Sequence, residues 1–297
     1  MSTRVYLSTA GRPLEPGEAT VSVFDRGFLY GDSVYETLRT AGGHPIEMTR
    51  HLDRLRRSAA GIGLVIPFSD QELRDAARVT HEAAGNADSY IRIIVTRGTG
   101  PIMLDPRLSS SPLLVVLVQE LSLPNPALYD TGLRVRIVDI TKISARALDP
   151  ALKTGNYLNS IQALRQAADG AAEDAILCNP QGHVAEGASS NVFMVQGGEL
   201  LTPSLATGLL EGITRAIVLA LARELGLAVR EATILPDELR AADEVFLTSS
   251  IRGPMPVTTL DGAPVGAGGV GPVTRRVMRR YAEYIAGVTA GGPELLT

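Results

Sequence analysis

Residues 175–202 read AILCNPQGHVAEGASSNVFMVQGGELLT, and this stretch decides what kind of fold the chain can adopt. Four short, mostly apolar runs are separated by polar and turn-forming residues, among them Pro180-Gln-Gly182 and Gln196-Gly-Gly198. Short runs joined by turns that contain glycine or proline are typical of antiparallel strands. The stretch therefore predicts a meander of strands, in which Glu186 ends the second one.

Outward from this meander, the chain shows both helix and strand patterns. Apolar residues at helical spacing predict helices at residues 50–61, 70–84, 157–168, 213–225 and 272–286, with Ser69 or Asp70 as the N-cap of the second. Apolar runs predict further strands at residues 5–7, 19–24, 90–96, 113–120, 133–140, 229–234 and 244–248. Together these elements predict the α+β class.

The domain boundary is predicted at residues 121–132, LSLPNPALYDTG, which contain two prolines and no periodicity. A chain of 297 residues is long enough for two cores. We therefore expect a small N-terminal domain at residues 1–120, a linker at 121–132 and a larger domain at 133–297.

Composition excludes several classes of protein. A formal net charge of −4, with basic and acidic side chains interleaved, argues against a nucleic-acid partner. A single cysteine, Cys178, excludes an internal disulfide, and no histidine pair has HExxH spacing, so we expect no metal site. The sequence has no apolar run long enough for a membrane span and no signal-peptide core at its start. We expect a soluble, cytoplasmic protein with no membrane partner.

Two segments could bind a phosphate group. Gly212 opens a predicted helix, so the amides of Ile213 and Thr214 are unpaired first-turn donors that suit an anion. Residues 248–250, Thr-Ser-Ser, end a predicted strand and could add hydroxyl and amide donors. Each feature alone is also what an ordinary helix start or strand end provides. GAGGVG at residues 266–271 predicts a flexible loop, because the chain after it has no room for a dinucleotide-binding βαβ unit.

Lysine is rare: Lys142 and Lys153 are the only two, and 26 of the 28 basic residues are arginine. Lys153 precedes a predicted helix, where the positive helix end and apolar neighbours would favour the neutral amine that a Schiff base requires. Lys142 stands in a polar context and is interpreted as a surface charge. Glu186 is either a surface acid at a strand end or the partner of a protonated heterocycle nitrogen, as pyridoxal phosphate needs.

Six blocks in a fixed order extend this hypothesis. They are DRGFLYGDSVYE (25–36), HLDRLRRSA (51–59), LKTGNYLNS (152–160), EGASSNVF (186–193), LLEGITR (209–215) and FLTSS (246–250). In these blocks the chain resembles the fold-type IV pyridoxal-phosphate enzymes, which include branched-chain and D-amino-acid aminotransferases and aminodeoxychorismate lyases. The resemblance implies a small N-terminal α/β domain, a larger domain with a β-barrel-like sheet, and pyridoxal 5′-phosphate bound at the domain interface.

The resemblance also implies roles for individual residues around the cofactor. Lys153 would form the Schiff base and carry the proton between the substrate Cα and the cofactor. Glu186 would pair with the pyridine nitrogen, and Tyr157 would hydrogen-bond the 3-oxygen. Arg54 would bind the phosphate bidentately. The remaining cofactor contacts would come from Leu210, which would pack on the ring, and from the amides of Ile213 and Thr214 with Ser249 and Ser250.

On the substrate side, the resemblance implies Tyr35 and Arg92 as lining residues, with Thr37 and Ile251 beside them. Residues around Tyr30 would reach the partner subunit's site, which implies a homodimer. The positions where D-amino-acid aminotransferases carry an Arg and a His after a TRGT segment hold Ile102 and Leu104 here. Arg92 instead favours an acidic 2-oxo acid acceptor. Thr37 and residues 251–253, Ile-Arg-Gly, are similar to the lyases, although those usually have Asn where Ser249 stands.

Three functional hypotheses follow. The leading one is an aminotransferase that exchanges an amino group between a branched-chain or aliphatic amino acid, L or D, and a 2-oxo acid such as 2-oxoglutarate or pyruvate. The second is aminodeoxychorismate lyase, which uses the same lysine and cofactor to release pyruvate. The third, a non-catalytic phosphate-ligand binding protein, predicts loss of Lys153 or Glu186, and both are present.

Overall fold

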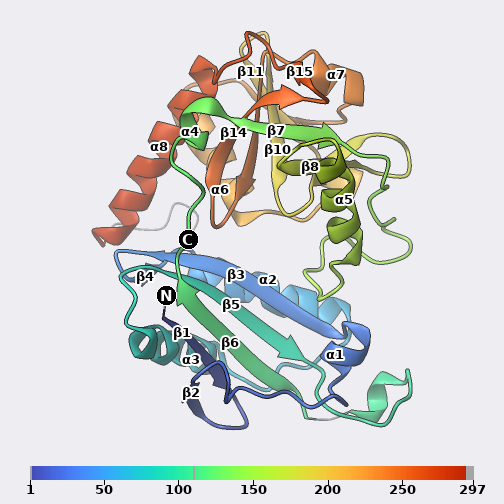
Figure 1. The fold of residues 1–297 in the computed structure, drawn as a ribbon, viewed down its shortest axis with the longest axis vertical. Helices are drawn as coiled ribbons and strands as arrows, with labels where there is room; N and C mark the ends of the chain where they lie inside the picture. Colours follow the sequence, from blue (N-terminus) through green and yellow to red (C-terminus); the bar gives the residue numbers. More distant parts are fainter. Residues whose placement is uncertain (1, 110, 292–297) are drawn as a thin grey trace. The chain divides into compact units, whose positions relative to one another are not determined.

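A computed structural model describes residues 2–109 and 111–291, which form two compact units (Figure 1). Unit 1 contains the chain up to Ser122 together with Leu152–Asn156. Unit 2 contains Leu123–Ala151 together with the chain from Tyr157 onward. The chain thus returns to unit 1 after unit 2 has begun. That residues 1–120 and 133–297 are separate domains stays a prediction.

Unit 1 is built on a six-stranded sheet in the order β2-β1-β6-β5-β3-β4, in which all neighbours are antiparallel. Helix α2 packs on β3, and α3 packs on β1 and β6, so that Leu52, Leu55 and Leu73 enter one apolar core with the strands. The elements of unit 1 are β1 (Thr3–Leu7), β2 (Arg12–Leu14), α1 (Arg26–Tyr30), β3 (Ser33–Ala41), β4 (His44–Pro45), α2 (Met48–Gly61), α3 (Asp70–Ala84), β5 (Ser89–Thr96), η1 (Pro106–Leu108) and β6 (Leu113–Glu120).

Helix α3 begins where its sequence predicts. The Ser69 hydroxyl accepts a hydrogen bond from the Glu72 amide at 3.2 Å, and the Glu72 carboxylate accepts one from the Ser69 amide at 2.7 Å. This reciprocal capping box satisfies two donors that the first turn of a helix otherwise leaves unpaired. Ser69, rather than Asp70, is therefore the N-cap.

The strand predicted at residues 19–24 is wrong. Strand β1 pairs with β2 and β6 instead, and residues 8–11 connect β1 to β2. Val21, Val23 and Phe24 are exposed instead of buried in a sheet. These apolar side chains therefore lie at the surface and not in a strand.

Unit 2 is built on a nine-stranded sheet in the order β12-β11-β10-β13-β14-β7-β8-β9, with β15 paired to β14. The sheet curls, because its last strand, β9, also lies against β10 and β11. This confirms the predicted α+β class with a barrel-like second sheet. The elements of unit 2 are α4 (Leu128–Thr131), β7 (Leu133–Ile137), α5 (Leu158–Asp169), β8 (Asp174–Cys178), β9 (Val184–Gly187), β10 (Asn191–Gln196), β11 (Glu199–Pro203), η2 (Leu205–Thr207), α6 (Ile213–Glu224), β12 (Val229–Ala232), α7 (Pro236–Arg240), β13 (Glu244–Ser249), β14 (Gly253–Leu260), β15 (Ala263–Pro264) and α8 (Pro272–Thr289).

Residues 175–202 do not form one continuous meander. They form two hairpins, β8–β9 and β10–β11, and the strands β13, β14 and β7 lie between β10 and β8 in the sheet. Strand β14 was not predicted, because Pro254 and Pro256 argue against a central strand. Their partners on β13 are Thr248 and Phe246. The prolines thus occupy alternate positions, and the residues between them can make the ladder hydrogen bonds.

Among the residues that the structure describes, no helix has both the length and the apolar character needed to cross a membrane.

Candidate active site

Lys153 is held in unit 1 by main-chain hydrogen bonds on both sides. Its amide donates to the Ser58 hydroxyl of α2 at 3.0 Å, and its carbonyl accepts from the Tyr35 amide of β3 at 3.0 Å. The next residue, Thr154, forms an isolated bridge with Val34. Lys153 therefore lies on an extended segment against β3, ahead of α5, and its backbone has little freedom to move.

The Tyr35 ring brings two cations together. The Lys153 Nζ lies 4.4 Å from the ring centroid, and the Arg92 Cζ lies 4.3 Å from it. Arg92 on β5 is the cross-strand partner of Thr37 on β3, so Thr37 also lies on the Tyr35 side of the sheet. Three of the five predicted substrate residues therefore lie on one face of unit 1, together with the lysine.

Arg54 belongs to a buried charge cluster. Its Nε and Nη2 donate to the two carboxylate oxygens of Glu36, each at 2.7 Å, and the Nδ1 of His51 lies 2.6 Å from Glu36 Oε2. Burial by itself would raise the pKa of Glu36, but Arg54 and His51 lower it to about 2. Burial lowers the pKa of His51, and although Glu36 raises it, Arg54 and Lys153 lower it as well, so that it lies below its usual value. A neutral His51 can donate from Nδ1 to an ionised Glu36.

This cluster fixes the orientation of Arg54, since a bidentate pair holds the guanidinium plane in place. Sequence reasoning missed Glu36, His51 and Ser58. All three stand inside the quoted blocks, but helix and strand patterns do not show which polar side chains meet in a core.

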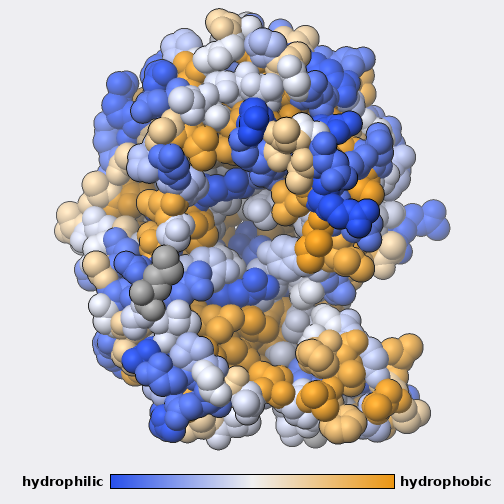
Figure 2. Space-filling model, viewed as in Figure 1, coloured by the Kyte–Doolittle hydropathy of each residue, from blue (hydrophilic) through white to orange (hydrophobic). Residues whose placement is uncertain are grey.

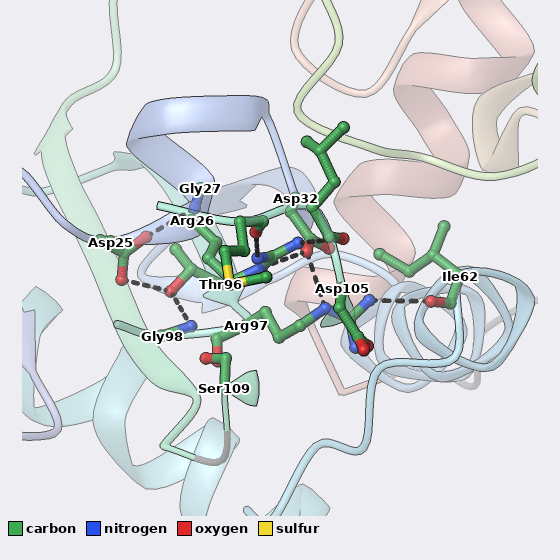
Figure 3. A network of polar contacts seen from close by, with 12 residues as sticks. Asp25, Arg26, Gly27, Asp32, Ile62, Thr96, Arg97, Gly98, Asp105 and Ser109 are labelled. Atoms are coloured by element: carbon green, nitrogen blue, oxygen red, sulfur yellow. Dashed lines mark hydrogen bonds and ion pairs between the residues drawn. The ribbon is translucent and has the colours of Figure 1, made fainter. Parts of the chain in front are cut away.

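Figure 3 shows a second polar network in unit 1, around Asp32. Arg26 Nε and Arg97 Nε both donate to Asp32 Oδ2, at 2.9 and 2.7 Å. Burial raises the pKa of Asp32, but the two arginines outweigh this effect and lower it. Arg26 also donates to the carbonyls of Met103 and Leu104, at 2.6 and 3.1 Å. The network thereby ties the loop before η1 to the sheet.

Tyr30 is the predicted substrate residue of unit 1 that lies elsewhere. It ends α1, and the Arg26 guanidinium carbon lies 5.1 Å from its ring centroid. It therefore belongs with the network of Figure 3 and not with Tyr35.

In unit 2, Glu186 lies on β9 and both of its carboxylate oxygens have partners. Oε2 accepts a hydrogen bond from the Leu210 amide at 3.1 Å. Oε1 forms an ion pair with the Lys142 ammonium. The interpretation of Lys142 as a surface charge is therefore wrong: its side chain is 17% exposed and that of Glu186 is 8% exposed.

The segment around Leu210 is held on its other side by Asn191 of β10. The Asn191 Nδ2 donates to the Leu210 carbonyl at 2.9 Å. The Asn191 Oδ1 also lies so near Gly212 that a Cβ there would come within 1.9 Å of it. Glycine is therefore required at 212 for a close approach. Asn191 is a further residue that the sequence patterns did not single out.

Gly212 is the N-cap of α6 and provides no side chain, so no side-chain cap occupies the amides of the first turn. Helix α8 differs, because the Glu244 carboxylate accepts hydrogen bonds from the amides of Val273 and Thr274 at its start, at 3.0 and 2.7 Å. An anion is favoured at a helix N-terminus. The first-turn amides of α6 therefore suit an anion from outside the chain, whereas the first-turn amides of α8 already bind the Glu244 carboxylate.

The end of β13 lies next to this helix start. Thr248 is the cross-strand partner of Asn191, and its buried Oγ1 has no hydrogen-bond partner among the residues that the structure describes. Ser249 ends β13, and Ser250 and Ile251 follow it in a turn; all three are half-buried. A buried hydroxyl without a partner is costly unless a ligand or water satisfies it. The donors of unit 2 thus suit an oxyanion, as a phosphate group would provide.

Tyr157 precedes α5 in unit 2 and is half-buried. Unit 1 holds an amine and a fixed guanidinium, and unit 2 holds a carboxylate and an anion-binding helix start. Pyridoxal phosphate has a chemical partner for each of these groups: its aldehyde for the amine, its phosphate for the guanidinium or the helix start, and its ring nitrogen for the carboxylate.

Comparison with known proteins agrees with this chemistry. Residues 33–260 match the family model of amino-transferase class IV. This chain belongs to the class IV aminotransferases. A putative branched-chain-amino-acid aminotransferase of Methanocaldococcus jannaschii is 35% identical over 280 residues, which cover 94% of this chain and 96% of that protein. The D-alanine aminotransferase of Bacillus licheniformis is 34% identical, over 94% of this chain and 97% of that protein.

Solved structures give the same result. The branched-chain amino acid aminotransferase of Escherichia coli superposes with a TM-score of 0.92 at 27% identity, over 100% of this chain and 98% of that one. A second branched-chain amino acid aminotransferase, solved with pyridoxamine 5′-phosphate, has a TM-score of 0.90 at 30% identity, over 97% of this chain and 95% of that one. The predicted family, fold, transaminase activity and pyridoxal-phosphate cofactor are thereby confirmed. The aminotransferase exchanges an amino group between an amino acid and a 2-oxo acid.

Proposed function

We propose that this class IV aminotransferase transfers the amino group of branched-chain and other aliphatic L-amino acids to an acidic 2-oxo acid such as 2-oxoglutarate. One observation carries the proposal: Arg92 and Lys153 lie against the same Tyr35 ring. A guanidinium binds a substrate carboxylate well. A carboxylate bound at Arg92 would bring the substrate Cα near the Lys153 amine.

The L-preference rests on the loop before η1. Ile102 and Leu104 replace the Arg and His of the D-amino-acid carboxylate trap, and their exposed fractions are 70% and 77%. Two exposed apolar side chains cannot pair with a carboxylate. This leaves Arg92 as the carboxylate partner that the proposal uses.

In the proposed site, Lys153 binds the cofactor covalently through Nζ and moves the proton to and from the substrate Cα. Bound pyridoxal phosphate would accept the electron pair that this proton leaves behind. Glu186 holds the proton on the ring nitrogen, Tyr157 hydrogen-bonds the 3-oxygen and Leu210 packs on the ring. No histidine is needed, because one amine serves as both anchor and base.

Arg54 binds the phosphate group in this proposal, and its orientation is fixed by Glu36. The amides of Ile213 and Thr214 bind the same group at the start of α6. The hydroxyl side chains assigned to the phosphate are those of Thr248, Ser249 and Ser250.

We also propose a homodimer in which Tyr30 and Ile251 line a substrate site completed by the partner. Figure 2 shows apolar side chains gathered on unit 1 where α1 and the loop before η1 lie. The exposed apolar residues of this patch are Val21, Val23, Phe24, Phe28, Ile102, Met103, Leu104 and Leu108. An exposed apolar patch marks an interaction surface. Analytical ultracentrifugation should give a dimer that Phe28→Glu dissociates, and a monomeric parent protein would contradict the proposal. We further propose a cytoplasmic location, which cell fractionation tests.

The test of the lysine uses borohydride reduction of the holoenzyme, followed by digestion and mass spectrometry. The cofactor should remain attached to the peptide that contains Lys153 and not to the one that contains Lys142. Attachment at Lys142 would overturn the assignment. Because these are the chain's two lysines, the experiment has no third outcome at an amine side chain.

The test of the substrate follows the visible absorption of the holoenzyme after addition of one amino donor at a time. L-valine and L-glutamate should convert the bound cofactor to its amine form, whereas D-alanine and an (R)-amine should not. Conversion by D-alanine alone would refute the L-preference. Absence of conversion by every donor, together with pyruvate release from aminodeoxychorismate, would indicate a lyase instead. Arg92→Leu should raise KM for 2-oxoglutarate without preventing cofactor binding.

A further inference from the structure

The ion pair between Lys142 and Glu186 is the feature that the proposed roles leave unused. Several ion pairs of unit 2 lie at the surface, such as that of Arg230 and Glu199, which are 57% and 33% exposed. The Arg252–Asp174 pair is more buried, at 20% and 3% exposed. The Lys142–Glu186 pair is largely buried. Burying two charges is costly, and a structural pair of this kind contributes little net stability. The pair therefore points to a function and not to stability alone.

The position of Lys142 is set by the sheet. Its amide donates to the Cys178 carbonyl at 2.8 Å, so its main chain runs beside the end of β8. On the other side of β8, Leu177 is the cross-strand partner of Glu186. Lys142 and Glu186 thus flank one strand, Lys142 through its amide hydrogen bond and Glu186 through the β8–β9 ladder. The ammonium reaches the carboxylate from this position.

Each oxygen of the Glu186 carboxylate has its own partner. Oε1 pairs with Lys142, while Oε2 accepts the Leu210 amide. These contacts hold the carboxylate plane in one orientation. A carboxylate held in place is what a protonated ring nitrogen needs as its partner.

We propose that Lys142 is a positioning residue, which acts through Glu186 to keep the ring nitrogen of the cofactor protonated. The inference rests on the proposed role of Glu186 at that nitrogen. Lys142 touches neither substrate nor cofactor in this role. Its ammonium offsets the cost of a buried negative charge and holds the carboxylate in one orientation for the ring nitrogen.

The experiment compares holoenzymes reconstituted with pyridoxal phosphate that carries nitrogen-15 in its ring, whose chemical shift reports protonation of that nitrogen. In the parent protein the shift should be that of a protonated ring. Lys142→Met should move the shift toward the unprotonated value and slow the half-reaction with L-valine about tenfold, the equivalent of one pKa unit. Lys142→Arg keeps the charge and should restore both readouts.

A double-mutant cycle tests whether Lys142 acts through Glu186. On a Glu186→Gln background, Lys142→Met should change the half-reaction rate by less than about twofold, because coupled residues are not additive. Arg230→Met is the matched control: it removes a cation from an ion pair of the same unit and should leave the shift unchanged.

Each outcome decides the inference. If Lys142→Met lowers thermal stability but leaves the nitrogen-15 shift unmoved, while Glu186→Gln moves it, the ion pair is structural and the inference is wrong. If neither variant moves the shift, the proposed role of Glu186 itself fails. Equal slowing by Lys142→Met on both backgrounds would also overturn the inference, since it would show a route that does not involve Glu186.

Discussion

Replacing Glu36 by glutamine tests how much the negative charge of Glu36 contributes to the stability of the buried cluster in unit 1. The carboxylate is fully buried and holds Arg54 by two hydrogen bonds of 2.7 Å. The fall of its pKa from the usual 4.5 to about 2 corresponds to about 3 kcal/mol of folding free energy. Glu36→Gln leaves the Arg54 cation buried without its counter-charge, which costs about 3–5 kcal/mol.

The sign of the pH dependence follows from the lowered pKa. A carboxyl group that is more acidic in the folded state contributes its full stability above its unfolded pKa, near 4.5. That contribution is lost as the pH falls from 4.5 toward about 2. The difference in unfolding free energy between parent and Glu36→Gln should therefore be constant from neutral pH down to about pH 5 and shrink below it.

The assay is urea unfolding of the cofactor-free protein, followed by circular dichroism at one protein concentration, so that the proposed phosphate binding by Arg54 does not contribute. Glu36→Gln combined with Arg54→Met should be more stable than Glu36→Gln alone, because the unpaired cation is removed. Glu82→Gln, which breaks an exposed pair with Arg78, is the control and should match the parent. A Glu36→Gln variant as stable as the parent, or a double variant less stable than the single one, would refute the reasoning.

Three other changes test separate features. Burial lowers the pKa of His51 below 6.5, so the unfolded chain binds a proton at this histidine before the folded protein does, and the free energy of unfolding falls as the pH drops below about 6.5. His51→Asn should flatten that part of the stability profile, and an unchanged slope would argue against a neutral histidine. Gly212→Ala would place a Cβ 1.9 Å from Asn191 Oδ1 and should weaken pyridoxal-phosphate binding at least about tenfold in equilibrium dialysis, whereas Gly269→Ala, which meets nothing within 4 Å, should bind as the parent does. Arg26→Met removes the hydrogen bonds to the Met103 and Leu104 carbonyls and should speed limited proteolysis at residues 101–108; cleavage at the parent rate would show that the network does not hold the loop.

Local signals account for what the sequence predicted well. Helix α3 could be placed because Ser69 and Glu72 form a capping box that lies within four residues of sequence. Helix α6 and the donors at its start followed from an apolar stretch opened by Gly212. Such features depend on neighbours along the chain, and an amino-acid pattern records them directly.

Features that depend on distant neighbours were missed. Strand β14 is a central strand despite Pro254 and Pro256, because the partners on β13 set a register that tolerates them. Residues 19–24 have strand-like composition but no strand beside them to pair with. Lys142 stands in a polar local context, and its amide hydrogen bond to Cys178 at the end of β8 places it beside Glu186. In each case tertiary pairing decided the outcome, and no local pattern encodes it.

The return of Leu152–Asn156 to unit 1 has a consequence for biosynthesis. A ribosome has made all of residues 1–122, and then a first portion of unit 2, before it reaches the segment that bridges to β3 and carries Lys153. A nascent chain that stops at Ser122 can form the six-stranded sheet but lacks the amine. The amine proposed to bind the cofactor thus arrives late, after its surroundings can already have folded, and a truncated product would present the proposed substrate-side residues of unit 1 without Lys153.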